Sequence, residues 1–253
     1  MSLLNDHLSL LEQRCGSHIH LGLDRIRAIA RQLDLLHPKA QVITVAGTNG
    51  KGSTVAAMES ILTHAGYAVG AYTSPHLRYF NERIRINQQM VSDEKIIGAF
   101  NKLFAIKAES TLSYFEFITL AALVIFNNAS LDIILLEVGL GGRLDAVNII
   151  DPNVSVITSI ALDHQQWLVN NRQQIAQEEA GILRRGIPVV IGEPDCPHII
   201  YQMANNLHCP IYEKCRLADI NISKLAVHRQ NARMAITALS CLNPIVNLNQ
   251  KQI

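Results

Sequence analysis

A glycine-rich turn carrying one lysine lies between an apolar segment and a predicted helix, in the stretch VITVAGTNGKGST at residues 42–54. Glycines in such a turn let successive backbone N–H groups point into one concavity, and the N-terminus of the next helix adds positive potential. Lys51 can reach the terminal phosphates of a nucleotide, and the Ser53 hydroxyl can bind Mg²⁺. The stretch therefore predicts a cradle for a nucleoside triphosphate.

The spacing of this cradle differs from the common P-loop pattern. Gly47 lies closer to Gly50 than that pattern requires, and Gly52 separates Lys51 from Ser53. The alternative interpretation is an ordinary strand-to-helix turn with a solvated lysine. The order of strand, loop, lysine, hydroxyl and helix favours the phosphate cradle.

Polar residues also stand where other predicted strands end. Ser74 follows the next apolar segment, Glu137 closes a third, and Asp163 and His164 follow a fourth. Parallel sheets bind ligands at the carboxyl ends of their strands, and oxygen and imidazole groups around a triphosphate can hold divalent ions. The alternatives are a turn residue at Ser74, a capping or ion-paired carboxylate at Glu137, and a surface or core histidine at His164.

Helical and strand-length segments alternate along the chain, which predicts an α/β fold with a doubly wound, mostly parallel sheet. The predicted helices cover residues 23–36, 53–65, 92–107, 114–127, 172–183, 197–206 and 227–242, and the predicted strands cover 42–46, 68–73, 131–138, 154–160, 188–191 and 210–212. We expect residues 1–194 to form an ATP-binding α/β domain and residues 195–253 a shortened C-terminal appendix of it.

Composition limits the classes of function. The 253 residues are 49% hydrophobic with a formal net charge of +1, which gives no electrostatic footprint for nucleic acid or an anionic membrane. The longest largely apolar run, 117–126, is too short to span a bilayer, and the N-terminus lacks a signal-peptide core. We therefore expect a cytoplasmic protein without nucleic-acid or membrane partners.

The cysteine pattern fits reduced thiols. Five cysteines is an odd number without repeated short spacing, as in cytosolic proteins. A zinc site is the alternative, but its candidate ligands follow no zinc-ligand spacing: Cys196, His198, His208, Cys209 and Cys215.

Several blocks between about residue 21 and residue 194 carry a family resemblance: LGLDRI, VAGTNGKGST, TSPHL with NERIRI, YFEFITLAAL, EVGLGGRLDA, ALDH and EEAGILRRGIPVVIGEP. Together they resemble the ATP-binding domain of the dihydrofolate synthase/folylpolyglutamate synthases, relatives of the Mur ligases. Such enzymes phosphorylate the carboxylate of dihydropteroate or a folate with ATP, and the amino group of glutamate then displaces phosphate. The resemblance implies a ligase of folate biosynthesis with ATP and Mg²⁺ as cofactors and pteroate or folate and glutamate as substrates.

The resemblance also implies residue roles. The implied catalytic residues are Lys51, Glu137, His164 and Glu179. The implied ATP-binding residues are Gly47, Thr48, Asn49, Gly50, Lys51, Gly52, Ser53, Thr54 and Asn231. Ser53 and Glu137 would bind one Mg²⁺, and Ser74, Glu137 and His164 a second. The loop after Ser74, Asp145, Ala146 and Glu116 match the substrate-binding region, with an exposed helical glutamate as the alternative for Glu116.

The sequence departs from the family in two places. Glu179, in the string EEAGI, replaces a lysine that the family modifies to a carbamate, and its carboxyl reaches roughly 4 Å less far. The string HRQNA at residues 228–232 comes shortly before the last residue. We therefore expect the C-terminal ligase domain to be absent, so that a separate chain would have to supply it and this chain would not ligate alone. A nucleotide-binding remnant or regulatory ATPase, and an inactive scaffold, remain the alternatives.

Overall fold

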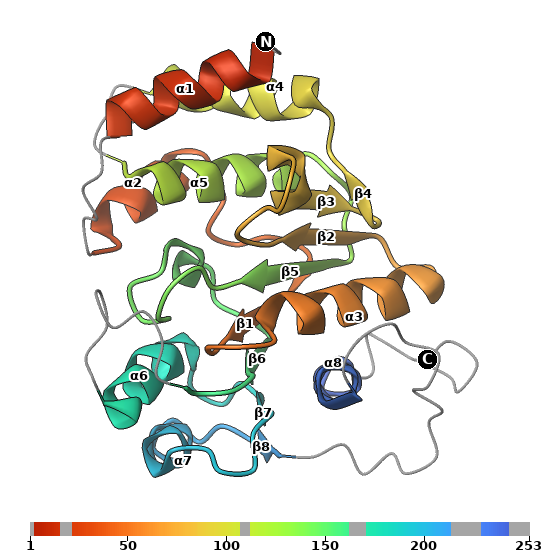
Figure 1. The fold of residues 1–253 in the computed structure, drawn as a ribbon, viewed down its shortest axis with the longest axis vertical. Helices are drawn as coiled ribbons and strands as arrows, with labels where there is room; N and C mark the ends of the chain where they lie inside the picture. Colours follow the sequence, from red (N-terminus) through yellow and green to blue (C-terminus); the bar gives the residue numbers. More distant parts are fainter. Residues whose placement is uncertain (1–2, 16–21, 107–111, 162–170, 214–228, 243–253) are drawn as a thin grey trace.

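The computed structural model describes residues 3–15, 22–106, 112–161, 171–213 and 229–242 (Figure 1). Its centre is an eight-stranded sheet in the order β4-β3-β2-β5-β1-β6-β7-β8. The strands are β1 (Gln41–Ala46), β2 (Val69–Tyr72), β3 (Ile84–Ile86), β4 (Gln89–Met90), β5 (Ile133–Glu137), β6 (Val154–Ile157), β7 (Val189–Ile191) and β8 (Ile211–Tyr212). All neighbouring pairs from β2 to β8 are parallel, and β3 and β4 form an antiparallel edge. The predicted mostly parallel α/β sheet is confirmed.

The sheet is apolar on both faces. In β1, Val42 and Ala46 pack into the core on one face, whereas Ile43 and Val45 pack into the core on the other. This alternation is the two-residue period of a strand, and it explains why β1 is mostly apolar.

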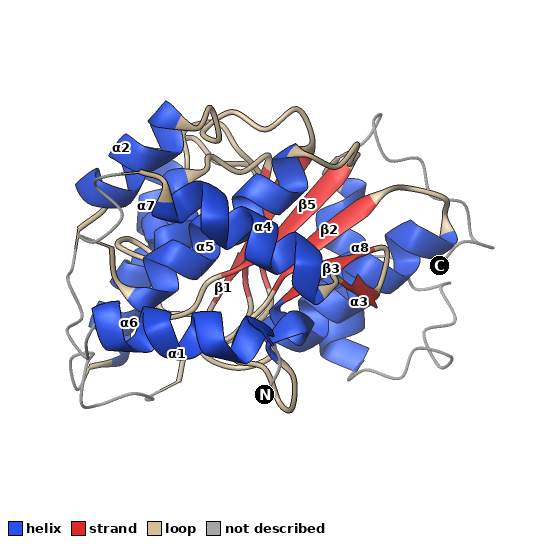
Figure 2. Cartoon of the chain, turned by 90° about the horizontal axis from the view of Figure 1, so that it is seen from above, coloured by secondary structure: helices blue, strands red, loops and turns tan. Residues whose placement is uncertain are grey.

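Helices cover both faces (Figure 1), and in the view from above they surround the strands (Figure 2). The helices contribute to two separate apolar cores, one on each face of the sheet. One core includes α1 (Leu3–Cys15), α2 (Asp24–Gln32), α4 (Asp93–Phe104), α5 (Tyr114–Asn127), α6 (Arg172–Glu179) and α7 (His198–Asn206), and the other includes α3 (Lys51–His64) and α8 (Arg229–Ser240). Helix α5 contacts β2, α1, α2 and α4, which explains its buried run from Glu116 to Phe126.

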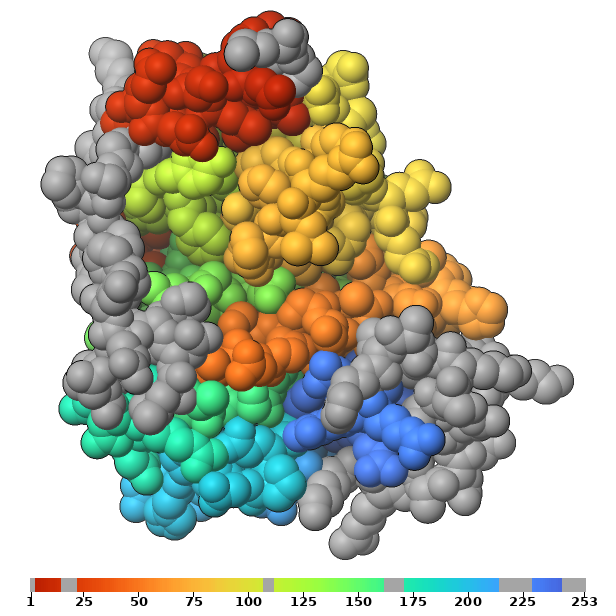
Figure 3. Space-filling view, viewed as in Figure 1, coloured from red at the N-terminus to blue at the C-terminus, as the bar shows by residue number. Residues whose placement is uncertain are grey.

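Helix α8 joins the fold from far along the chain. It packs against α3, β6 and β7, and the space-filling view shows α8 against α3 (Figure 3). Strand β8 extends the same sheet beside β7. The division at residue 194 into a domain and an appendix stays a prediction.

Some predicted bounds differ from the structure. The helix predicted over 23–36 ends at Gln32, because Leu33 caps it and Asp34 adopts a left-handed φ of 54°. Helix α6 ends at Glu179, and its predicted continuation is the 3₁₀ turn η4 (Ala180–Ile182). The sequence did not predict α1 or the β3–β4 hairpin. Among the described helices, none is long and apolar enough to cross a membrane.

Candidate functional site

The predicted phosphate cradle connects β1 to α3. Gly47 and Gly50 have left-handed φ values of 117° and 89°, and Gly50 is the N-cap of α3. A Cβ atom at Gly47 would overlap the Thr158 hydroxyl and lie 2.9 Å from backbone atoms of residues 158 and 159. Both the backbone conformation and the close approach to the segment that follows β6 therefore require glycine at position 47.

The cradle is bonded to the segment that follows β6. The Thr48 amide donates to the Ser159 carbonyl at 2.6 Å, and the Asn49 amide donates to the Ser159 hydroxyl at 3.2 Å. The Thr48 hydroxyl donates to the Ala161 carbonyl and accepts from the Ala161 amide. Thr48 and Asn49, predicted as nucleotide-binding residues, thus also anchor the loop.

The two hydroxyls at the start of α3 have different environments. The Thr54 hydroxyl is buried and donates to the Gly50 carbonyl at 2.8 Å, so it is used within the helix. Ser53 is exposed on the same turn. Of the two, Ser53 has the hydroxyl that is accessible to a ligand. Its predicted role as a Mg²⁺ ligand stays a prediction.

Lys51 lies among buried acids. Its Nζ donates to the carbonyls of Gly47 at 2.5 Å and Thr48 at 3.2 Å. Its charge also lowers the pKa values of Glu137, Asp145 and Glu179, although burial raises all three above their ordinary values. Three buried carboxyls thus lie within range of the charge of one lysine. This excess of acid favours the binding of a further cation.

Glu137, at the end of β5, joins three parts of the predicted site. Its Oε2 accepts the Ser74 amide at 3.1 Å, and both carboxylate oxygens lie 3.5 Å from the Cβ position of Gly52 on α3. Burial is the main cause of its raised pKa, and the Ser74 amide and Lys51 oppose that shift. The structure therefore brings Ser74, Glu137 and the cradle together.

Glu179 reaches the cradle despite its short side chain. Its Oε2 accepts the Gly47 amide at 2.9 Å, and its side chain is buried. Burial raises the pKa of Glu179 to about 7. Close packing makes this reach possible, since a Cβ atom on Gly142 would lie 2.8 Å from the carbonyls of residues 178 and 179.

Asp145 holds the loop between β5 and η3 (Ala146–Ile149). Its Oδ2 accepts the amides of Gly139 at 2.9 Å and Leu140 at 3.0 Å, and its Oδ1 accepts the Val147 amide at 3.0 Å. Burial raises the pKa of Asp145 to about 6. Asp145 thus has a clear structural function, and Ala146 beside it is buried. A substrate-binding role for either residue stays a prediction.

Glu116 is buried at the start of α5, so the alternative of an exposed helical glutamate is wrong. Its carboxylate accepts the Ser113 amide at 2.7 Å in a capping box and forms an ion pair with Arg25 at 3.2 Å. Asn231 of α8 lies beside the cradle, because a Cβ atom on Gly50 would be 2.9 Å from its Oδ1. Glu116 packs at the start of α5, whereas the Asn231 side chain lies next to Gly50 of the cradle.

The ligand set predicted for metal is only partly described. His164 lies outside the described residues, and within the described part no three His, Cys, Asp or Glu side chains converge as a metal centre. Ser53, Ser74 and Glu137 offer oxygen donors, the type that Mg²⁺ prefers. The donors and the excess of buried acid fit such an ion. Of the zinc alternative, Cys196 and Cys209 are free thiols, and Cys215 is outside the described residues.

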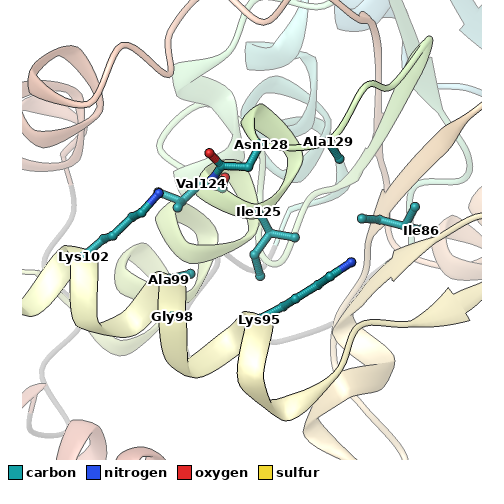
Figure 4. A pocket seen from close by; sticks show the side chains of 9 residues that line it. All are labelled: Ile86, Lys95, Gly98, Ala99, Lys102, Val124, Ile125, Asn128 and Ala129. Atoms are coloured by element: carbon teal, nitrogen blue, oxygen red, sulfur yellow. Dashed lines mark hydrogen bonds between the residues drawn. The ribbon is translucent and has the colours of Figure 1, made fainter.

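A separate cavity of about 250 Å³ lies between α4 and the end of α5 (Figure 4). Its wall includes Ile86, Ile125, Asn128, and Lys95 and Lys102 from α4. These elements meet at the edge where β5 begins, opposite the edge where Glu137 and the cradle lie. No residue predicted for the site lines this cavity.

Comparison with known proteins points to one family. The Mur ligase middle domain matches residues 45–240. The dihydrofolate synthase/folylpolyglutamate synthase of Haemophilus influenzae is 52% identical over 208 residues, covering 82% of this chain and 47% of that protein. The enzyme of the same name from Escherichia coli is 48% identical over 197 residues, covering 78% of this chain and 47% of that protein. The chain thus spans about half the length of these curated relatives.

Solved structures agree with the sequence comparison. E. coli FolC in complex with DHPP and ADP superposes with a TM-score of 0.90 at 40% identity, covering 99% of this chain and 65% of that one. The bifunctional folylpolyglutamate synthase/dihydrofolate synthase of Yersinia pestis, complexed with AMPPNP and Mn ion, superposes with a TM-score of 0.91 at 40% identity, covering 100% and 65%. The likeness therefore includes nearly all of this chain.

Proposed function

The chain belongs to the Mur ligase family and, within it, to the dihydrofolate synthase/folylpolyglutamate synthases, and from this premise we propose that it contributes ATP-dependent ligation of glutamate to dihydropteroate or a folate. Its cofactors are then ATP and Mg²⁺, and its partners are small molecules: a pteroate or folate acceptor, and glutamate. A separate chain that supplies further contacts to nucleotide and glutamate is part of the proposal. A cytoplasmic location stays a prediction from the sequence.

The observation that carries the proposal is the position of Lys51. The lysine stands at the first turn of α3, next to a cradle with two left-handed glycines, and its charge acts on Glu137, Asp145 and Glu179. Backbone amides, a helix N-terminus and a lysine form an anion site, and carboxylates beside it suit a divalent cation. A nucleoside triphosphate with Mg²⁺ satisfies both halves of this arrangement.

The chemistry of the proposed reaction requires charge cancellation. A carboxylate oxygen of the acceptor attacks the γ-phosphorus, the bond to the β,γ-bridging oxygen breaks, and ADP leaves with an acyl phosphate remaining. The glutamate amine then attacks the acyl carbon, loses a proton and expels orthophosphate. Two anions meet in the first step, so we assign Lys51 and the cradle amides to the phosphates.

We assign Ser53, Ser74, Glu137 and His164 to Mg²⁺, which supplies further positive charge at the phosphate oxygens when bound. Glu179 is assigned to the cradle, because its carboxylate accepts the Gly47 amide. Asn231 beside Gly50 is assigned to the nucleotide. Asp145, Ala146 and Glu116 are assigned to the acceptor region, in addition to the contacts they make within the fold.

Calorimetric titration with ATP in Mg²⁺ tests the proposal. We expect wild type to bind, and Lys51→Ala to weaken binding at least about tenfold, which is about 1.4 kcal/mol. Lys95→Ala is the matched control, because Lys95 lines the cavity at the opposite edge of the sheet. The absence of ATP binding by wild type, or equal affinity in Lys51→Ala, would contradict the proposed nucleotide site.

Nucleotide binding or hydrolysis without ligation is the second candidate function. The observation that favours it is Glu179, an acid in the position of the family lysine, whose carboxylate occupies the Gly47 amide. Mass spectrometry after incubation with ATP, Mg²⁺, dihydropteroate and glutamate separates the two. A glutamylated product supports the ligase and shows that this chain ligates without a second one. Phosphate release that does not depend on dihydropteroate supports the second candidate, because the first step of the ligase transfers the γ-phosphate to the acceptor.

A further inference from the structure

The segment that follows β6, residues 158–161, has two sides. Toward the cradle, the Ser159 carbonyl accepts the Thr48 amide at 2.6 Å, and the amide and carbonyl of Ala161 both bond the Thr48 hydroxyl. Ile160, between them, is buried. Because alternate residues of an extended backbone point their N–H and C=O groups to opposite sides, the backbone polar groups of Ile160 face away from the cradle.

Two charged side chains bond the backbone of Ile160 on that far side. Its amide donates to Glu193 Oε2 at 2.7 Å, and its carbonyl accepts from Arg172 Nε at 2.7 Å. Glu193 comes two residues after the end of β7, and Arg172 is the first residue of α6. A buried amide and a buried carbonyl each need a partner, and these side chains supply both from 33 and 12 positions away.

The two side chains also bond each other. A terminal nitrogen of Arg172 donates to Glu193 Oε1, so both oxygens of this carboxylate are used. The Glu193 side chain is only 14% exposed, so water screens this ion pair less than it screens a surface pair. The other terminal nitrogen of Arg172 donates to Asp195 at 2.9 Å. Ile160, Arg172 and Glu193 thus form a closed ring of charge-assisted hydrogen bonds.

The backbone next to Glu193 is fixed as well. The Gly192 amide donates to the Ile157 carbonyl at 2.9 Å, and the Gly192 carbonyl accepts from the Gln230 side chain of α8 at 2.5 Å. A Cβ atom at Gly192 would lie 2.7 Å from the Thr158 carbonyl. Glu193 therefore projects from a backbone that β6 and α8 hold on both sides.

An arginine beside a phosphate cradle can also bind the phosphates itself. Arg172 is placed differently, because its Nε and both terminal nitrogens donate to Ile160, Glu193 and Asp195. These bonds use the planar donor fork of the guanidinium within the fold. A guanidinium bonded in this way acts on the cradle through the backbone that it holds.

We propose that Arg172 and Glu193 are positioning residues for the nucleotide cradle. They hold residues 159–161, which in turn hold Thr48 and Asn49 of the cradle in place for a triphosphate. The inference rests on the proposed function, which supplies the nucleotide. Neither side chain contacts the phosphates or Mg²⁺ in this assignment. Donors that are already in place lose less entropy when the ligand binds, so a looser segment should weaken nucleotide affinity.

The test uses the complete 253-residue chain. The affinities for ATP and for inorganic tripolyphosphate, each with Mg²⁺, are titrated in wild type, Arg172→Gln and Glu193→Ala. We expect each variant to bind both ligands at least about tenfold more weakly, because the cradle holds the phosphates that the two ligands share. Hydrogen exchange of the Thr48 amide should be faster in both variants, because its acceptor, the Ser159 carbonyl, is held less firmly.

Arg184→Gln is the matched control. Arg184 also pairs with a carboxylate, that of Asp151, and donates to a backbone carbonyl, that of Asn148, at 3.0 Å. Arg184 precedes β7 and Asp151 precedes β6, so this pair lies where these strands begin, whereas the cradle lies where the strands end. Arg184→Gln should lower the urea midpoint of unfolding as Arg172→Gln does, but its affinity for Mg²⁺-ATP should stay within about twofold of wild type.

Two further variants separate positioning from unrelated structural contacts. Glu193→Gln keeps an oxygen for the Ile160 amide but removes the charge of the ion pair, so we expect its ATP affinity to lie between those of wild type and Glu193→Ala. Arg172→Gln combined with Glu193→Ala should lose little more affinity than either single variant, because both side chains act through Ile160. Two independent contacts would instead give additive losses.

The outcomes are distinguishable. Wild-type ATP affinity in either Arg172→Gln or Glu193→Ala overturns the positioning role while the proposed function stands; if Glu193→Ala does not fold, wild-type affinity in Glu193→Gln has the same meaning. An equal loss of affinity in Arg184→Gln also overturns it, because that marks general destabilisation. Weaker binding with unchanged exchange of the Thr48 amide overturns it as well, because Arg172 would then contact the phosphates itself. If wild type binds neither Mg²⁺-ATP nor tripolyphosphate, the proposed nucleotide site fails and the positioning role fails with it.

Discussion

Glu179 is a buried acid whose charge the fold opposes. Its pKa rises from an ordinary 4.5 to about 7, mainly through burial. Between pH 4.5 and about pH 7, Glu179 keeps its proton in the folded chain but releases it in the unfolded chain. The folded state therefore binds more protons in this window, and its stability falls as pH rises through it.

This linkage gives the first prediction. Without nucleotide or Mg²⁺, Glu179→Gln removes the titration but keeps an oxygen to accept the Gly47 amide. The free energy of unfolding of the variant, relative to that of wild type, should rise by on the order of 2 kcal/mol from pH 5 to pH 8. Urea unfolding at several pH values measures the difference. A constant difference across that range would show that Glu179 is charged in the folded chain throughout.

Glu137 gives a second prediction. Its carboxylate lies between the Ser74 amide and Gly52 at the start of α3. Glu137→Gln keeps the size and removes the charge, so it should weaken ATP binding at least about tenfold in Mg²⁺ and much less in EDTA. The EDTA titration is the internal control. Equal ATP affinity of variant and wild type in Mg²⁺ would assign Glu137 a structural role only.

The turn between β1 and α3 depends on glycine for two separable reasons. Gly47 has φ 117° and would collide with Thr158 if it carried a Cβ atom, whereas Gly66 after α3 has φ 91° with open space around it. Gly66→Ala should therefore lower the free energy of unfolding by about 1 kcal/mol, through backbone strain alone. Gly47→Ala should lower it by at least about 3 kcal/mol, because the collision with Thr158 after β6 adds to the strain. Urea denaturation of both variants compares the two losses, and equal losses would show that the cradle can move away from the segment after β6.

The elements were predictable where their signal is local. Helix α5 occupies the predicted residues 114–127, because its capping box and continuous apolar run lie within the segment itself. The β3–β4 hairpin was missed because Asn87 and Gln88 adopt left-handed φ values of 52° and 65° without a glycine. Distant groups stabilise that turn: the Asn87 side chain accepts the Val69 amide, and the Gln88 amide donates to Glu59. No local pattern contains such contacts.

The features of the site were likewise predictable only where their signal lies within one short segment. The cradle and the carboxylate at the end of β5 could be located from short motifs, because each belongs to a single strand end. The bond from Gly47 to Glu179 joins residues 132 positions apart, and the one from Arg25 to Glu116 spans 91 positions. The burial of Glu116 and the reach of Glu179 depend on those long-range contacts, so the sequence predicted neither.

The whole molecule brings its C-terminal part back to the cradle through α8. Ile236 and Leu239 are buried in the core that α8 shares with α3, and Met234 lies at the Cβ position of Gly192 after β7. Asn231, one turn earlier, is only half-buried and points its Oδ1 toward Gly50. One helix thus supports the sheet with one part and faces the proposed nucleotide site with another.

The last prediction separates those two functions of α8. Leu239→Ala should lower the free energy of unfolding by about 3 kcal/mol, because it leaves a cavity between α8 and α3, yet the folded variant should keep its affinity for ATP. Asn231→Ala should leave stability within about 0.5 kcal/mol of wild type, since its side chain is half-exposed, and weaken ATP binding severalfold. Urea unfolding and calorimetric titration of both variants provide the measurement. If Asn231→Ala binds ATP as wild type does, α8 serves only as a structural cover of α3, and the nucleotide site ends at the cradle.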